Sequence, residues 1–256
     1  MVRGDTTKTQ SKLLYPITNN RMATKRILAD IRNIKSEDMA SMRIYYNPNE
    51  ENLQTGTALF FGPEGTIYQD LPILLELEFP TEYPFASPRV KFLTTDGKTR
   101  LHPNLYIEGK VCLSILGTWN GPSWTSVMNL RTVLLSIMGL LDNEPILHEP
   151  GYTSYKGTQK SRDYSSFVEH ACIRYIVNTI ERCSKDEYDP SLAKFKEQWI
   201  QALPTIYKNT MTRLTRLAAE PVRIWGSVVY NMSGTSHYSE MLEKLLSIGG
   251  TMKIVK

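Results

Sequence analysis

Residues 79–88 have the sequence FPTEYPFASP, and residues 102–116 have the sequence HPNLYIEGKVCLSIL. Three prolines exclude a regular helix or strand from the first stretch, so it predicts a stiff surface loop. The second stretch places Asn104 eight residues before Cys112, with Gly109 between them to permit a tight turn. Together the two stretches predict a chain whose loops, rather than its regular elements, carry the chemistry.

Short runs suited to β-strands lie around these loops: 43–46, 57–61, 73–79 and 90–93. The connections between them are too short for the crossovers of a dozen or more residues that parallel strands need. The runs therefore predict a four-stranded antiparallel meander. The third run alternates, as expected for a half-buried strand: one face would hold Ile73, Leu75, Leu77 and Phe79, and the other Leu74, Glu76 and Glu78.

Helical periodicity is present before and after the predicted sheet. The first helix is expected to start at Thr24 and to bury one face, made up of Ile27, Leu28, Ile31 and Ile34. Asn129 is placed to cap a buried central helix that extends to Asn143. Further helices are expected at 162–182, 192–202, 205–219 and 238–248.

These patterns predict an α+β fold with three parts. Residues 1–20 are polar and are expected to form a flexible N-terminal tail. Residues 21–182 are expected to form the core domain, and residues 183–256 a helical C-terminal extension.

Composition excludes several classes of function. The net charge is only +4 and the basic residues are scattered, which gives no support for nucleic-acid binding. No apolar run approaches the 18 residues needed to cross a membrane. The three cysteines form no zinc pattern, so no metal is expected, and their odd number argues against a disulfide framework. The N-terminus lacks the apolar core of a signal peptide, and a cytoplasmic, possibly also nuclear, location is expected.

Cys112 taken alone has two interpretations. A free cysteine is more often a small buried hydrophobe than a nucleophile. A papain-type hydrolase would pair such a cysteine with a downstream histidine, but the His-Pro-Asn spacing has no role in that chemistry.

The ordered series of motifs resembles the ubiquitin-conjugating enzyme family over roughly residues 22–182. The resemblance rests on the two opening stretches, on Trp124, on the central helix and on His148-Glu149-Pro150-Gly151. It implies the UBC fold. The segment 104–124, NLYIEGKVCLSILGTWNGPSW, looks like that of the large, extended members charged by the noncanonical ubiquitin-activating enzyme.

The resemblance also implies roles at the site. Cys112 would carry ubiquitin, or a ubiquitin-like protein, as a thioester. Asn104 would stabilise the oxyanion or hold the loop around it, and Glu149 would help to activate the attacking lysine. The position two residues after the cysteine, often acidic in the family, is Ser114 here. That leaves open a protein that works only with a thioester-forming ligase.

The remaining residues implied by the resemblance are structural or bind partners. Those near the site with structural roles are His102, Pro103, Trp124 and His148, and those on the ligase-docking surface are Lys25, Arg26, Phe85 and Ser126. The expected partners are ubiquitin or a relative, an activating enzyme, a ligase and protein substrates. No cofactor is expected, because the chain has no phosphate-binding loop and the activating enzyme would use the ATP.

The alternative is a catalytically inactive variant that acts as a scaffold. Such variants lack the cysteine, whereas Cys112 is in register here. The active interpretation requires the Cys112 thiol to be exposed beside the Asn104 amide.

Overall fold

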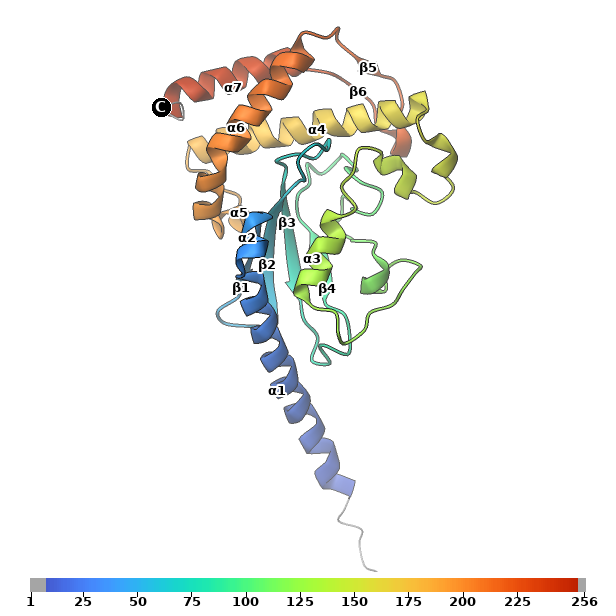
Figure 1. The fold of residues 1–256 in the computed structure, drawn as a ribbon, viewed down its shortest axis with the longest axis vertical. Coiled ribbons are helices and arrows are strands. Elements are labelled where there is room, and N and C mark those ends of the chain that lie inside the picture. Colours follow the sequence, from blue (N-terminus) through green and yellow to red (C-terminus); the bar gives the residue numbers. More distant parts are fainter. Residues whose placement is uncertain (1–7, 253–256) are drawn as a thin grey trace, which may run out of the picture.

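The computed structural model describes residues 8–252 (Figure 1). The α-helices are α1 (Lys8–Ile34), α2 (Glu37–Ser41), α3 (Leu130–Met138), α4 (Gln159–Ser184), α5 (Pro190–Ala193), α6 (Lys196–Ala218) and α7 (Tyr238–Met252). The strands are β1 (Ile44–Pro48), β2 (Thr55–Phe61), β3 (Pro72–Glu78), β4 (Arg89–Phe92), β5 (Ile224–Trp225) and β6 (Gly234–Thr235). The predicted α+β class is confirmed.

The main sheet has the strand order β1-β2-β3-β4, with every neighbouring pair antiparallel. Its register pairs Ala58 of β2 with Leu75 of β3, and Leu75 with Phe92 of β4. The predicted meander is therefore confirmed. Leu74 differs from the alternating pattern: it is only 2% exposed, and it lines a hollow together with Ala171 and Tyr175 of α4.

Helix α1 begins at Lys8 rather than at the predicted Thr24, so residues 8–20 of the expected tail have a helical backbone. Residues 1–7 of that tail lie outside the described residues. The N-terminal part of α1 projects beyond the rest of the ribbon (Figure 1). The predicted buried face is confirmed for Ile27, Ile31 and Ile34, whereas Leu28 is 39% exposed because it lies at the edge of that stripe.

Helix α3 starts as predicted and ends early. Asn129 Oδ1 accepts a hydrogen bond from the Thr132 N–H, and the Thr132 hydroxyl accepts one from the Asn129 N–H. This reciprocal pair fixes the first turn. The helix ends at Met138, before Gly139, and not at Asn143.

The segment after α4 is helical, as predicted, and the break expected near Glu220-Pro221 is present because α6 ends at Ala218. The helices before that break have other bounds than predicted. Helix α6 runs through Pro204, where two helices were expected to be separated. Pro204 faces solvent, and the helix buries Trp199, Leu203 and Ile206 on both sides of it. That burial offsets the roughly 3 kcal/mol that an internal proline costs.

Helices α6 and α7 pack against each other and against α4, which lies between them and the sheet (Figure 1). The short strands β5 and β6, which no sequence pattern indicated, pair in the connection from α6 to α7. No helix in the described part of the chain is long and apolar enough to span a bilayer. The division into a 21–182 core and a 183–256 extension stays a prediction.

Candidate active site

The segment from His102 to Cys112 is folded by its own hydrogen bonds. The Asn104 N–H donates to His102 Nδ1 at 3.0 Å, and the Leu105 N–H donates to the His102 carbonyl at 3.0 Å. Gly109 has a φ of +98°, and a Cβ there would come within 3.0 Å of the Phe92 carbonyl oxygen. The glycine is therefore required both by the turn and by the close approach of β4.

Asn104 and Cys112 are paired twice. The Cys112 N–H donates to the Asn104 carbonyl at 2.8 Å, and Asn104 Nδ2 donates to the Cys112 carbonyl at 2.8 Å. The family resemblance implied that Asn104 lies beside Cys112, and the structure brings the two residues together. The amide is bonded to the backbone at the cysteine, which corresponds to the loop-holding alternative.

The thiol of Cys112 is not exposed, contrary to expectation. The residue is 1% exposed, and its backbone is held on both sides by neighbouring turns. It nevertheless lies outside the hydrophobic core cluster, whereas Cys172 and Cys183 belong to that cluster. Burial raises the pKa of Cys172 and that of Cys183 to about 12. Cys112 is therefore as buried as a core residue, although its neighbour Val111 belongs to the cluster and Cys112 does not.

Thr118 binds the backbone on both sides of Cys112. Its hydroxyl donates to the Val111 carbonyl at 2.7 Å and accepts from the Leu113 N–H at 2.9 Å. The residues bonded to it thus flank Cys112 on either side. Because Cys112 is only 1% exposed, a reagent or cargo can reach its thiol only if neighbouring residues move.

His102 has an electrostatic environment that keeps it neutral. Burial, together with the nearby His148, lowers its pKa to about 3. Since His102 Nδ1 already accepts the Asn104 N–H, the histidine has no free basic nitrogen there. His148 lies against His102 with ring centroids 4.8 Å apart, and its Nε2 pairs with the Asp142 carboxylate at 2.9 Å.

Glu149 is engaged by the C-terminal extension. Its carboxylate accepts a hydrogen bond from the Tyr230 hydroxyl. Its assignment as the carboxylate that activates the lysine stays a prediction. In this conformation one of its carboxylate oxygens already accepts the Tyr230 hydrogen bond. Tyr230 is a contact that sequence reasoning missed, because no pattern links residues so distant in the chain.

The segment around Trp124 is tied to the proline-rich loop and to α1. Trp124 Nε1 donates to the Pro84 carbonyl at 2.7 Å. Arg26 donates to the Ser126 carbonyl at 2.8 Å and to the Met128 carbonyl. The guanidinium of Arg26 is thus bonded within the chain, and its place on a ligase-docking surface stays a prediction.

Phe85 and Lys25 are exposed next to this segment, and Phe85 is 67% exposed. The Ser126 carbonyl, by contrast, is occupied by Arg26. Docking of a partner at these residues stays a prediction.

Asp30 is a buried junction that the sequence did not reveal. Its carboxylate accepts hydrogen bonds from Tyr83, from Arg26 at 2.8 Å and from the Leu130 N–H at 3.2 Å. It thereby joins α1, the proline-rich loop and the start of α3. A charged residue among apolar ones on a helix was the only available signal.

Comparison with known proteins assigns the family. The family model described as ubiquitin-conjugating enzyme matches residues 26–173. The chain belongs to the ubiquitin-conjugating enzyme family. It is 38% identical over 180 residues to a probable ubiquitin-conjugating enzyme protein 17 of Caenorhabditis elegans, with 66% of this chain and 25% of that protein covered.

Two further relatives are named ubiquitin-conjugating enzyme E2 Z. The Xenopus tropicalis protein is 39% identical over 153 residues, with 59% of this chain and 48% of that protein covered. The Homo sapiens protein is 38% identical over 153 residues, with 59% and 43% covered. This family member thus spans a quarter to about half of the length of these relatives.

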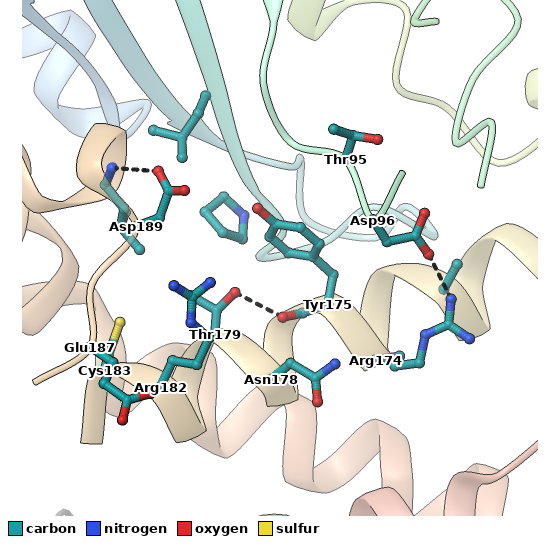
Figure 2. A pocket seen from close by; sticks show the side chains of 14 residues that line it. Thr95, Asp96, Arg174, Tyr175, Asn178, Thr179, Arg182, Cys183, Glu187 and Asp189 are labelled. Carbon is teal, nitrogen blue, oxygen red and sulfur yellow. Dashed lines mark hydrogen bonds and ion pairs between the residues drawn. The ribbon is translucent and has the colours of Figure 1, made fainter. Parts of the chain in front are cut away.

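A hollow of about 280 Å³ lies at the junction between the family domain and the extension (Figure 2). Its walls include Arg174, Cys183 and Asp189, and Arg174 is paired with Asp96 at 2.7 Å. None of the predicted site residues lines this hollow. In the described residues, no group of three or more His, Cys, Asp or Glu side chains could hold a metal ion.

Proposed function

We propose that this chain accepts ubiquitin, or a ubiquitin-like protein, from an activating enzyme as a thioester on Cys112. It then passes the cargo to a substrate lysine or to a ligase. The observation that carries the proposal is the double pairing of Cys112 with Asn104 in a chain of this family.

The first step is a transthiolation. The Cys112 sulfur attacks the carbonyl carbon of the cargo's C-terminal residue, which is bound as a thioester to the activating enzyme. A new carbon–sulfur bond forms, the old one breaks, and the proton of the Cys112 thiol is balanced by protonation of the departing sulfur. Asn104 Nδ2 has a second hydrogen that can donate to the oxyanion while the first stays on the Cys112 carbonyl.

The second step forms an amide when a lysine amine displaces the Cys112 sulfur. The amine must be neutral to attack, which favours a nearby carboxylate as base. Glu149 is the proposed candidate, and it must exchange its contact with Tyr230 for the lysine. Transfer to the cysteine of a thioester-forming ligase needs no such base.

The exposed Phe85, next to Lys25 and Ser126, is the proposed docking point for a ligase. The likeness of residues 104–124 to the extended members supports charging by the noncanonical activating enzyme. Incubation with ubiquitin, ATP and each class of activating enzyme distinguishes the two routes of charging.

The decisive experiment is a charging assay with cysteine variants. Wild-type protein is expected to give a ubiquitin adduct that thiol reagents remove, and Cys112→Ser is expected to give a thiol-resistant oxyester. Cys183→Ser is the matched control and is expected to charge as wild type does. A wild-type chain that forms no adduct with either class of activating enzyme would favour the scaffold alternative.

A further inference from the structure

The C-terminal extension contacts Arg100, just before the segment that leads to Cys112, through Tyr230 and Met232. Tyr230 lies in the connection between α6 and α7, in a turn where its φ is +63°. The guanidinium of Arg100 lies 4.5 Å from the centroid of the Tyr230 ring and 3.4 Å from the centroid of the Tyr106 ring. Arg100 therefore connects the extension to the middle of the candidate catalytic segment.

Arg100 is held by further contacts on both sides. Its side chain donates a hydrogen bond to the Pro103 carbonyl, in the residue before Asn104. Its backbone N–H donates to Met232 Sδ at 3.3 Å, and its carbonyl accepts from the Tyr164 hydroxyl at 3.1 Å. A shift of Arg100 would therefore shift the peptide that positions Asn104.

The segment that Arg100 contacts is short and continuous with the reacting residue. The Tyr106 N–H bonds the Lys110 carbonyl at 2.9 Å, and Asn104 bonds Cys112 at both its N–H and its carbonyl. Pro103 and Tyr106, the two contacts of Arg100, flank Asn104 in the sequence. Displacement at either one is passed directly to the pair that surrounds the thiol.

We propose that Tyr230 is a positioning residue for the reaction of Cys112, acting through Arg100 on the segment Pro103–Tyr106. The inference rests on the proposed function for its meaning in catalysis. The extension is then a part of the catalytic unit. The aromatic ring of Tyr230, rather than its hydroxyl, makes the contact that positions the segment. A cation–π contact with a shielded guanidinium supplies the coupling.

The test compares Tyr230→Phe, which keeps the ring, with Tyr230→Leu, which removes it. Transthiolation from the charged activating enzyme is measured in single turnovers, with the maximal rate and the half-saturating concentration determined separately. The maximal rate of Tyr230→Phe is expected to stay within twofold of that of wild type. Leu is expected to lower the maximal rate about fivefold to tenfold, the scale of one desolvated cation–π contact, with half-saturation unchanged.

A second readout does not depend on the activating enzyme. Alkylation of each cysteine by iodoacetamide is followed by mass spectrometry, and Leu is expected to speed the alkylation of Cys112 severalfold. Cys172 and Cys183, which lie in the core, report general opening and are expected to stay protected. Faster alkylation of all three would show general destabilisation and would overturn the inference.

Two further variants complete the test. In an Arg100→Met background, Tyr230→Leu is expected to have no additional effect on either readout, whereas additive effects would overturn the proposed route through Arg100. Ile224→Ala, on β5 and 77% exposed, is the matched control in the same connection and is expected to behave as wild type.

The outcomes separate the two proposals. If wild-type protein charges and Tyr230→Leu charges at the same rate, the inference is overturned and the proposed function stands. Wild-type protein that does not charge overturns the function, and the alkylation series still decides whether Tyr230 restrains the Cys112 segment.

Discussion

Asn104 and Cys112 are joined by two hydrogen bonds of 2.8 Å, one from each residue to the carbonyl of the other. Asn104 Oδ1 is buried and has no hydrogen-bond partner among the described residues. The side chain is therefore oriented by what it donates. A substitution that keeps the shape of the Asn104 side chain but removes its N–H donor therefore tests what that donor contributes.

Asn104→Asp makes that change. We expect transfer from Cys112 to free lysine to slow about 100- to 1000-fold, because a carboxylate cannot donate to the oxyanion or to the Cys112 carbonyl. Single-turnover discharge of the thioester measures the effect. The matched control is Asn143→Asp, since Asn143 Nδ2 makes a similar bond to the Gly65 carbonyl at 2.9 Å. An Asn104→Asp rate within threefold of wild type would contradict the assignment.

Thr118→Val is expected to expose Cys112. The substitution removes the hydrogen bonds between the Thr118 hydroxyl and the backbone of Val111 and Leu113, each worth about 0.5–1.5 kcal/mol. Iodoacetamide should then alkylate Cys112 about tenfold faster, since 1.4 kcal/mol corresponds to a factor of ten. Thr118→Ser retains the hydroxyl and should restore the wild-type rate. Unchanged alkylation in Thr118→Val would mean that another segment limits access.

Asp30→Ala is expected to lower the free energy of unfolding by about 3–5 kcal/mol, because it leaves the partners of a buried carboxylate unpaired. Urea denaturation measures the loss. Arg32→Ala, on the exposed face of the same helix, should change stability by less than about 0.5 kcal/mol. A loss for Asp30→Ala no greater than that of Arg32→Ala would refute the role of this junction.

His102 predicts a pH dependence of stability. The unfolded chain binds a proton at this residue near pH 6.5, whereas the folded chain does not until about pH 3. Stability should therefore fall as the pH is lowered through this window, by up to about 1.4 kcal/mol per pH unit from this residue. His170, whose pKa is lowered to about 4 by burial, acts in the same direction.

The measurement is urea denaturation at pH 7, 6 and 5. His102→Gln should show a flatter dependence than wild type over this range. The exposed His237 supplies the control, and His237→Gln should keep the wild-type slope. Equal slopes for wild type and His102→Gln would show that the burial of His102 does not govern the acid sensitivity.

Local features were predicted well, and the reason is that they depend on near neighbours. Alternating apolar residues located the strands, and Asn129 located the start of α3. The family resemblance of the short segment 102–116 implied that Asn104 lies beside Cys112. Pro204 misled the prediction, because the loss of one backbone hydrogen bond is local whereas the burial that offsets it is spread along the helix.

The sequence by itself determined the order of the elements and the meander, since these follow from periodicity and short-range turns. Its family resemblance also named residues that lie at Cys112. Only the tertiary structure decided that Cys112 is buried. It alone also decided that Asp30 accepts a hydrogen bond from Tyr83, 53 residues away, and that the Arg100 N–H donates to Met232, 132 residues away. Such contacts depend on which surfaces the packed helices bring together. No local pattern of residues encodes that outcome, because the partners become neighbours only when the core is formed.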